Sequence, residues 1–425
     1  MHNKLINLAK KSNIDLEINE SKTESVDIGV LNKKEKHYQV TKVKSYLIKA
    51  IKDNKCVKLE VESLKNPEKI ISNIKTILDI QDNDNKNYLS KGNISKLNKD
   101  KDVTNYNKVS KDLRNLYELK DKYPNLANLE LEYEYANNSI TIKNASSNLK
   151  SSDYYHVFAA GVSVNDKEKS KASYITYFAK NYDFNGFKEE IITSLEGLKY
   201  KLNSTSLKTD RYNIIIKNNI VADILAAFVS MFYTKNIMQN ESILVDKFNK
   251  KVFSDKISIV EEPFSESAIY RKYFDTEGTK TTTKKIIDNG VFIKKLNNIE
   301  YAIKSNESET GNASGVFNMH IVSGNNTYDE LIKELDNGII IDEAMGLHSG
   351  IDVKSGNISI PVSGYLVENG VITKGVDMIV LSTNIFELLS NVISVGNDMS
   401  HSRIDVLSPS LLLSNIAIAG GEQDE

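Results

Sequence analysis

The fold of this chain is decided by the stretch from Gly338 to Asp398, GIIIDEAMGLHSGIDVKSGNISIPVSGYLVENGVITKGVDMIVLSTNIFELLSNVISVGND. It begins with the apolar run 339–341 and continues with glycines at short intervals, at positions 346, 350, 356 and 364. Glycine at this density suits a backbone that turns tightly or passes close to another surface. Asn369-Gly370 then stands between two apolar runs, which is a strong β-hairpin signal because both residues tolerate a positive φ. The stretch is therefore predicted to be β-rich, with one short helix that begins near Ile385.

A second hairpin is predicted upstream, at Asn289-Gly290 in IIDNGVF, and its turn is similar to VENGVI in the first stretch. Two such hairpins indicate a C-terminal domain of mainly antiparallel sheet. Before them, 214–216 predicts a short buried strand. Residues 220–238 predict a largely buried helix, because Ile220, Ile224 and Phe228 share one helical face.

The first half of the chain alternates strand and helix patterns. Strands are predicted at 14–18, 26–30, 46–51 and 56–61, and Pro67 opens a helix that continues to Leu78. Helices are also expected over 113–123 and 187–202. Between them, residues 129–179 predict an antiparallel meander with turns at Asn137-Asn138 and Asp166-Lys167.

These patterns predict an α+β protein. We expect an N-terminal mixed α/β domain over residues 1–205 and a C-terminal, mainly antiparallel β domain over residues 206–425. A polar excursion is expected at 82–111, which is polar and has little periodicity. A chain of 425 residues has room for this division.

Charge is unevenly spread along the chain. The formal net charge is −2, but from Ile321 to Glu425 the balance is −11, and over the first 320 residues it is +9. Such asymmetry can accompany a nucleic-acid face. Because no arginine-rich or aromatic-interleaved basic motif supports one, we interpret the lysines as solvated and do not expect nucleic acid as a partner.

The sequence also bears on the cellular compartment. Cys56 is the only cysteine, so no disulfide can form within the chain. The start, MHNKLINLAKKS, is amphipathic and lacks the apolar region of a signal peptide. The longest apolar stretch, 220–233, is interrupted by Asp223 and is too short to cross a bilayer. We therefore expect a cytoplasmic protein without a membrane partner.

Several motifs carry a family resemblance. Three motifs resemble, in order and spacing, the C-terminal region of the TldD/PmbA family: AMGLHSGIDVKSGNISIPVSGYLVENGVI, NVISVGNDM and SPSLLLSNIAIAG. FDTEGT resembles it further upstream, and IKNAS at 142–146 does so more weakly, so the resemblance covers about residues 5–421. Members are called modulators of DNA gyrase and are viewed as zinc-dependent peptidases or their partner subunits. The resemblance implies a dimeric assembly and proteolysis as the family's activity.

Family members that cleave peptides resemble one another at a helix that carries His-Glu-x-x-x-His, where two histidines bind zinc and the glutamate activates water. A C-terminal cysteine is a further ligand. The corresponding helix here, IVADILAAFVSMFYTK, contains neither histidine nor glutamate. No two of the six histidines are three to five residues apart. We therefore assign no catalytic residue and no metal ligand to this chain and expect zinc only in a catalytic partner. A site assembled from distant residues, such as His320 with His348 and Asp342, stays open as an alternative.

Seven residues are candidate contacts to a peptide or a partner, and they come from FDTEGT, from MGLHSG and from the later segment PVSGY: Asp275, Glu277, Gly278, Gly346, His348, Gly350 and Gly364. Loops of this kind often carry function. The alternative for His348 is packing within its loop. For Asp275 and Glu277 it is bonding to local backbone or to lysines such as Lys280.

Three functions remain open at this point. The first, implied by the resemblance, is a non-catalytic PmbA/TldE-type subunit that pairs with a TldD-like zinc peptidase, or with itself, and holds unfolded peptide. The second is a hydrolase with an unrecognised centre at His348 or at the acidic pair. The third is a standalone modulator or interaction protein.

Overall fold

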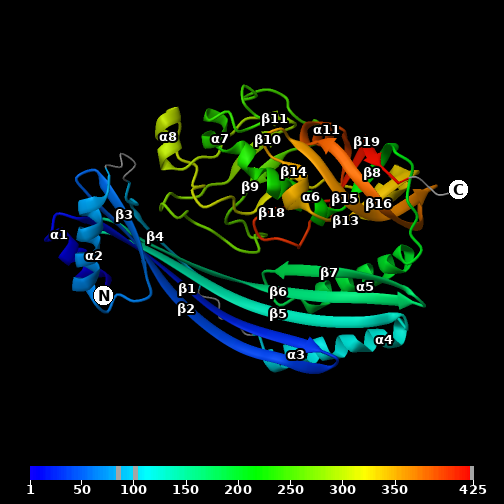
Figure 1. The fold of residues 1–425 in the computed structure, drawn as a ribbon, viewed down its shortest axis with the longest axis horizontal. Helices are drawn as coiled ribbons and strands as arrows, with labels where there is room; N and C mark the ends of the chain where they lie inside the picture. Colours follow the sequence, from blue (N-terminus) through cyan, green and yellow to red (C-terminus); the bar gives the residue numbers. More distant parts are fainter. Residues whose placement is uncertain (83–87, 99–103, 422–425) are drawn as a thin grey trace.

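The computed structural model describes residues 1–82, 88–98 and 104–421. It confirms the α+β fold: a long curved sheet forms the N-terminal part, and two further sheets form the C-terminal part (Figure 1). The chain passes from one part to the other between α5 (Phe184–Lys201) and β8 (Asp210–Ile216). None of the helices formed by the described residues has the length and apolar character needed to cross a membrane.

The N-terminal sheet has seven strands within the described residues, in the order β3-β2-β1-β5-β6-β4, and β7 also pairs with β6. Parallel β4 and antiparallel β7 occupy different halves of one edge of β6. The strands are β1 (Asp15–Leu31), β2 (Lys34–Lys52), β3 (Lys55–Val61), β4 (Asn93–Leu97), β5 (Leu126–Lys143), β6 (Asn148–Asp166) and β7 (Lys169–Ala179).

Helices cover the two ends of this sheet and leave its middle without a helical cover (Figure 1). At one end, α1 (His2–Lys10) and α2 (Pro67–Ile80) bury a core that includes Leu5, Ile48 and Ile74. At the other end, α3 (Tyr106–Asn115), a 3-10 turn, α4 (Leu119–Lys122) and α5 bury a second core. The side chains of β1 are therefore buried near each end and more exposed around residues 19–24. This is why the predicted strands at 14–18 and 26–30 are one continuous strand.

Two N-terminal expectations need correction. Asn137-Asn138 is not a turn, because both residues lie within β5 and pair with β1 and β6. Hydrogen bonds to two neighbouring strands outweigh the turn preference of asparagine. The chain reverses later, where the Asn144 side chain accepts a hydrogen bond from the N–H of Ser146. The polar stretch 82–111 includes β4 and the start of α3, while its residues 83–87 and 99–103 lie outside the described residues. β4 joins the sheet by backbone pairing with β6, and its side chains are mostly exposed. The sequence therefore shows no alternation of apolar and polar residues that would have predicted this strand.

The C-terminal part contains a small sheet and a larger one. In the small sheet the order is β11-β10-β9-β12-β18. Its strands are β9 (Ile259–Glu261), β10 (Lys284–Asp288), β11 (Val291–Phe292), β12 (Met319–Ile321) and β18 (Val406–Leu407). The larger sheet has the order β13-β8-β19-β16-β15-β14 and closes on itself because β13 also pairs with β15. Its further strands are β13 (Gly338–Ala344), β14 (Ile351–Asp352), β15 (Asn357–Glu368), β16 (Val371–Asn384), β17 (Val392–Val395) and β19 (Leu411–Ala419).

Both predicted hairpins are confirmed, at Asn289-Gly290 and at Asn369-Gly370, and all four turn residues have a positive φ. The predicted helix over 220–238 is interrupted: α6 (Asn218–Phe228) is followed by a 3-10 turn at 229–232 and by α7 (Thr234–Met238). α6 packs in the main core with β8 and β13, and Phe228 is fully buried. The remaining helices are α8 (Ile299–Ser305), α9 (Tyr328–Leu335), α10 (Leu347–Gly350) and α11 (Ile385–Ser390).

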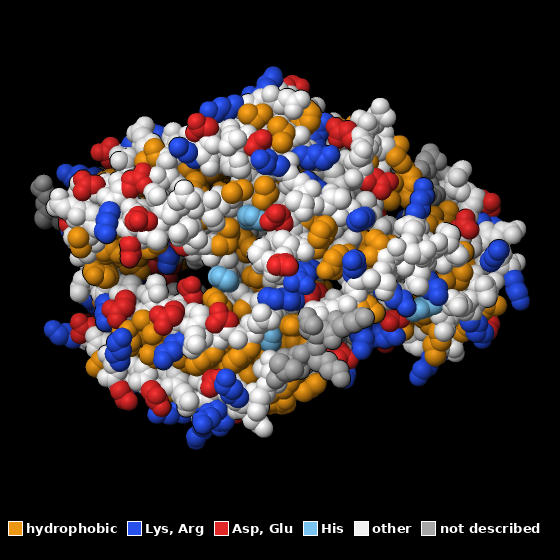
Figure 2. All heavy atoms as spheres, turned by 180° about the vertical axis from the view of Figure 1, so that it is seen from behind, with side chains coloured by type: hydrophobic (Ala, Val, Ile, Leu, Met, Phe, Trp, Pro, Cys, Tyr) orange, Lys and Arg blue, Asp and Glu red, His pale blue; other side chains and the backbone are white. Residues whose placement is uncertain are grey.

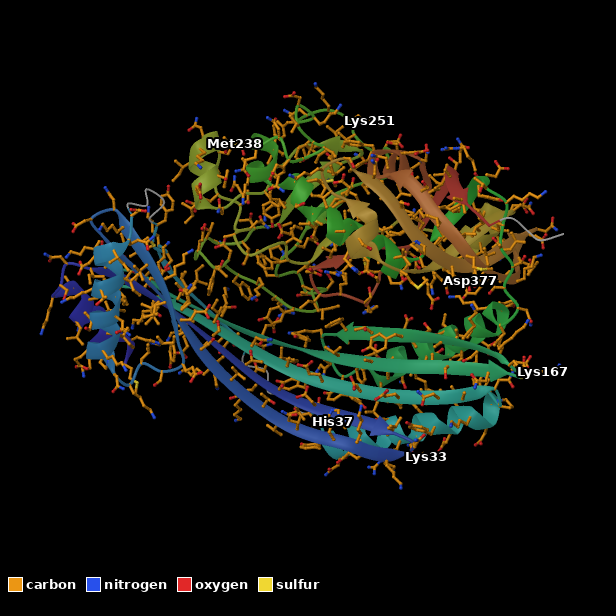
Figure 3. All side chains as sticks on the ribbon, in the orientation of Figure 1. Lys33, His37, Lys167, Met238, Lys251 and Asp377 are labelled. Atoms are coloured by element: carbon orange, nitrogen blue, oxygen red, sulfur yellow. The ribbon has the colours of Figure 1, made fainter. Side chains whose placement is uncertain are left out.

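The two parts face each other across the edge of the N-terminal sheet. Asp377, in β16, lies on the side of the C-terminal part that faces β6 and β7 (Figure 3). It forms an ion pair with Lys171 of β7. The loop before β18 also reaches β7, where the N–H of Phe178 donates to the carbonyl of His401 (2.7 Å).

Candidate functional site

Asp275 and Glu277 bond to the backbone of their own surroundings. The Asp275 carboxylate is 1% exposed and accepts hydrogen bonds from the N–H groups of Glu277, Thr279 and Ala313, each at 2.9 Å. Burial raises the pKa of Asp275 to about 6, although these donors favour its charged form. Glu277 accepts from the N–H of Ile299 at the start of α8 (2.9 Å). The structure therefore uses the oxygens of both residues to hold loops in place.

Gly278 brings this loop against the N-terminal part. Its φ is +80°, and a Cβ at this position would lie 2.7 Å from Cδ1 of Leu149 and even closer to Ser90. Glu277 and Gly278 line a cavity of about 440 Å³ together with residues 88–91. Their predicted role in binding a peptide or partner stays a prediction.

The other four candidates belong to the closed sheet and its loop. Gly346 has φ 65° and immediately precedes α10, which carries the exposed His348. Gly350 lies against the backbone of β15, and Gly364 lies against the carbonyl of Ile340 in β13. None of the four lines the cavity beside Gly278. The seven candidates therefore do not form one site.

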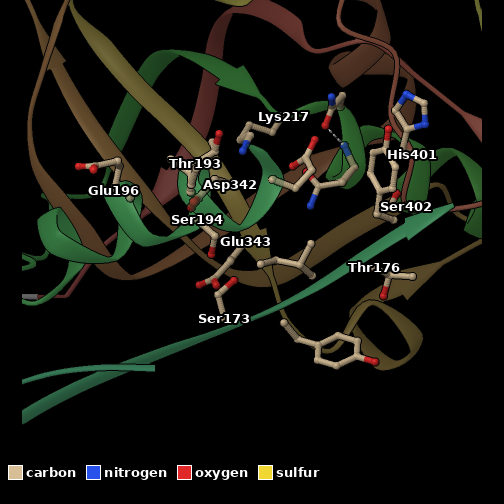
Figure 4. A pocket seen from close by; sticks show the side chains of 18 of the residues that line it. Ser173, Thr176, Thr193, Ser194, Glu196, Lys217, Asp342, Glu343, His401 and Ser402 are labelled. Carbon is tan, nitrogen blue, oxygen red and sulfur yellow. Dashed lines mark hydrogen bonds between the residues drawn. The ribbon is translucent and has the colours of Figure 1, made fainter. Parts of the chain in front are cut away.

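A different set of residues surrounds a cavity of about 580 Å³ between the two parts (Figure 4). β7 and α5 supply the side from the N-terminal part, while the start of α6, β13, β15 and the loop around His401 supply the opposite side. Figure 2 shows the surface hollowed between the two parts when the molecule is seen from behind. This cavity is the candidate site.

A partly buried ion cluster adjoins the candidate site, and its members Asp342, Glu343 and Tyr365 line the cavity. The Lys201 ammonium lies 2.8 Å from Oδ1 of Asp342 and 2.9 Å from Oε2 of Glu343, and the Lys201 side chain is 5% exposed. The Tyr365 hydroxyl donates to Oδ2 of Asp342 (2.5 Å). Burial and the neighbouring Asp342 carboxylate raise the pKa of Tyr365 far above its ordinary value. The tyrosine is thus held as a neutral hydrogen-bond donor.

The first turn of α6 lines the same cavity with amide side chains. The Asn218 amide donates to the backbone carbonyl of Asp398 (2.8 Å), and its backbone N–H donates to Oγ of Ser410 (3.0 Å). Oδ1 of Asn219 and Oγ of Ser402 are buried without a hydrogen-bond partner among the described residues. Unpaired buried polar atoms at a cavity mark positions where a ligand could supply the missing partner.

The outer edge of β7 crosses the cavity with its backbone unpaired over several residues. Phe178 bonds outward to His401, so the alternation of an antiparallel strand turns Thr176 and Tyr174 outward as well. No backbone partner on that side is found for these two within the described residues. An open edge of this kind can pair with an added extended chain.

Sequence patterns did not single out these residues. Lys201 reads as an ordinary charged residue at the end of a helix, and Tyr365 as one member of a strand. The only sequence feature that distinguished Asn218 and Asn219 was their position at the start of the apolar helix. Their proximity depends on how α5, β13 and α6 meet in space.

A model of the PmbA/TldA metallopeptidase C-terminal domain matches residues 209–420. The chain belongs to the PmbA/TldD family. This confirms the resemblance that the motifs indicated.

Curated members of the family match the C-terminal half. A Metalloprotease PmbA homolog of Buchnera aphidicola subsp. Baizongia pistaciae is 32% identical over 221 residues, which are 52% of this chain and 49% of that protein. Metalloprotease PmbA of Escherichia coli O157:H7 is 27% identical over 220 residues, 52% of this chain and 48% of that protein. The chain thus spans about half the length of the curated relatives it matches.

Solved structures match over nearly the whole chain. A protein of Thermotoga maritima MSB8 named as a candidate modulator of a DNA gyrase has a TM-score of 0.88 at 25% identity and covers 98% of this chain and 99% of its own. TldE from Thermococcus kodakarensis has a TM-score of 0.83 at 18% identity, and the match covers 99% of this chain and 100% of that chain. The second likeness shows the fold alone.

The α6 side chains do not fit the zinc that the family implies. Asp223 bonds to Arg403 (3.3 Å), and Asn218 bonds to Asp398, so these polar groups already have protein partners. Among the residues that the structure describes, no three His, Cys, Asp or Glu side chains are grouped so that they could hold a metal ion. The alternative set of His320, His348 and Asp342 is not brought together either. Zinc prefers histidine and cysteine, and amide side chains are poor substitutes.

Proposed function

We propose that this chain is a non-catalytic subunit of a PmbA/TldD-type peptidase assembly and holds unfolded peptide in the candidate site. The observation that carries the proposal is the start of α6: it lies in the cavity but presents Asn218 and Asn219, which cannot activate water with a metal, while the unpaired Oδ1 of Asn219 can accept a hydrogen bond from a peptide. The partner would be a family member with His-Glu-x-x-x-His or a second copy of this chain. We further propose that the assembly works in the cytoplasm.

The open edge of β7 supports peptide holding. An extended peptide that adds to this edge gains backbone hydrogen bonds, which do not depend on its side chains. Such binding suits unfolded chains of varied sequence. Asn219 and Ser402, on the opposite side of the cavity, offer the unpaired polar atoms described above.

One experiment tests the edge directly. Thr176→Pro removes an outward N–H while leaving the bonds between β6 and β7 intact, since proline is tolerated where the N–H faces away from the sheet. We expect roughly fivefold weaker binding of an unstructured fluorescent peptide, because about 1 kcal/mol of backbone bonding is lost. Thr176→Ala keeps the N–H and serves as the matched control. Equal peptide affinity of the two variants would contradict the proposed role of the β7 edge in binding peptide.

A second experiment tests the catalytic role. The purified chain is incubated with the same peptide with added zinc, with chelator, and with a homologue that carries the zinc motif. We expect no hydrolysis by the chain alone and faster cleavage when the homologue is present. Hydrolysis by this chain alone that chelator abolishes would contradict the proposal.

A further inference from the structure

A separate cavity of about 460 Å³ lies over the middle of the N-terminal sheet. Its lining includes residues 21–23 of β1, residues 138–140 of β5 and Tyr155 of β6, which face loops of the C-terminal part. The same loop that lines the candidate site with residues 401–403 lines this cavity with Ile404 and Asp405. Consecutive residues of one loop thus line the two cavities, which share none of their described lining residues.

Lys272 gives this cavity a positive charge that no described carboxylate balances. The Lys272 ammonium lies 5.0 Å from the ring centroid of Tyr270, and no ion pair to a described residue is formed. The other charged lining groups are already paired: Asp405 with Arg403 (2.9 Å), and Lys22 with Glu24 (2.6 Å). A desolvated charge without a partner is costly, and burial accordingly lowers the pKa of Lys272.

The backbone of Lys272 is held by two hydrogen bonds. Its N–H donates to the carbonyl of Pro263 (2.7 Å), and its carbonyl accepts from the hydroxyl of the fully buried Thr281 (2.7 Å). Tyr270 and Tyr155 stack edge to face beside it, with ring centroids 5.6 Å apart. The Tyr270 hydroxyl has no hydrogen-bond partner among the described residues. A desolvated cation with a neighbouring hydroxyl donor is an arrangement that suits an anion.

The rest of the lining indicates what kind of anion fits. Val316, Phe317 and Ile404 supply apolar surface. No arginine is found among the described residues that line the cavity, so they lack the paired donors that favour phosphate. One ammonium with hydroxyl donors matches a single negative charge. The apolar surface matches a short hydrocarbon body attached to it.

We propose that this cavity binds a carboxylate that carries a small apolar group, with Lys272 as its counter-ion. Two sources have this chemistry: the C-terminal residue of a peptide and a free short-chain carboxylic acid. The inference does not depend on the proposed peptidase role, since it concerns a different cavity and its test measures no hydrolysis.

The test measures binding of three probes to the full chain by calorimetry: N-acetyl-leucine, its amide N-acetyl-leucinamide, and 4-methylpentanoate. We expect the acid N-acetyl-leucine to bind at least tenfold more tightly than the amide. Binding of N-acetyl-leucine but not 4-methylpentanoate identifies a peptide terminus as the source, whereas binding of both identifies a simple carboxylic acid. Equal binding of N-acetyl-leucine and its amide, or no binding of either acid, overturns the proposal.

Variants assign the effect to the cation. Lys272→Met should lose at least tenfold in affinity for the acid, and Lys272→Arg should retain most of it. Lys22→Met is the matched control, because Lys22 lines the same cavity but is paired with Glu24. If Lys272→Met does not fold, the native chain still decides the question. N-acetyl-leucine, and not its amide, should then slow acetylation of Lys272 as measured by mass spectrometry. If neither N-acetyl-leucine nor its amide changes the rate of Lys272 acetylation, the proposal is overturned.

Discussion

Replacing Gly364 with alanine should open the closed sheet of the C-terminal part. A Cβ at this position would lie 2.8 Å from the carbonyl carbon of Ile340, 3.2 Å from Cα of Ile341, and nearer still to the carbonyl oxygen of Ile340. These atoms are backbone of β13, which is paired on both sides, with β8 and with β15. No side-chain rotation can relieve the overlap, so the two strands must separate.

The cost follows from that geometry. Overpacking that side chains can absorb costs about 1–3 kcal/mol, and this contact with backbone belongs at the upper limit. Loss of a hydrogen bond between β13 and β15 adds about 1 kcal/mol. The total of about 4 kcal/mol corresponds to a fall in melting temperature of roughly 8–16 °C for a folding unit of this size. Because Tyr365 follows directly, its bond to Asp342 in the candidate site should weaken as well.

Thermal unfolding followed by circular dichroism measures the effect, and hydrogen exchange of residues 338–344 and 357–368 locates it. Gly161→Ala is the matched control. Gly161 is also inside an antiparallel strand, but there the nearest atom to a new Cβ is the Cβ of Glu130 at 3.9 Å, an ordinary contact. That variant should melt close to the native chain or slightly above it. Gly364→Ala within about 2 °C of the native melting temperature, with unchanged exchange, would refute the reasoning.

Three further outcomes are expected. Lys201→Met should destabilise the protein by about 3 kcal/mol in thermal unfolding, because it leaves the buried Asp342 carboxylate without its cation; an unchanged melting temperature would count against the cluster. Glu277→Ala should cost about 1 kcal/mol, since the N–H of Ile299 loses its acceptor, and hydrogen exchange at the start of α8 should report it. Burial raises the pKa of Asp275 to about 6, whereas the unfolded value is about 3.9. The folded state therefore holds the proton more tightly, and the stabilisation that this provides is complete below pH 4 and is lost as the pH rises through 6. Measured against Asp275→Asn, the native chain should lose up to about 3 kcal/mol between pH 4 and pH 7, and a flat difference would contradict this.

The sequence by itself determined the elements whose cause is local. Asn289-Gly290 and Asn369-Gly370 predicted their hairpins because both turns need a positive φ, and Pro67 marked the start of α2 because its missing N–H costs nothing there. The motifs of the C-terminal half were also enough to identify the family. Side-chain periodicity then indicated α5 and the buried face of α6.

Only the tertiary structure decided where these elements meet. Asn137-Asn138 carries a turn signal, yet both residues lie inside β5 because two neighbouring strands satisfy their backbone. The seven predicted contacts fall in separate places. The candidate site instead joins Lys201 to Asp342, which are far apart along the chain but 2.8 Å apart in space. Local patterns register the conformational preferences of a few adjacent residues, whereas ion pairs and cavities arise from packing between distant segments, which no short stretch of sequence encodes.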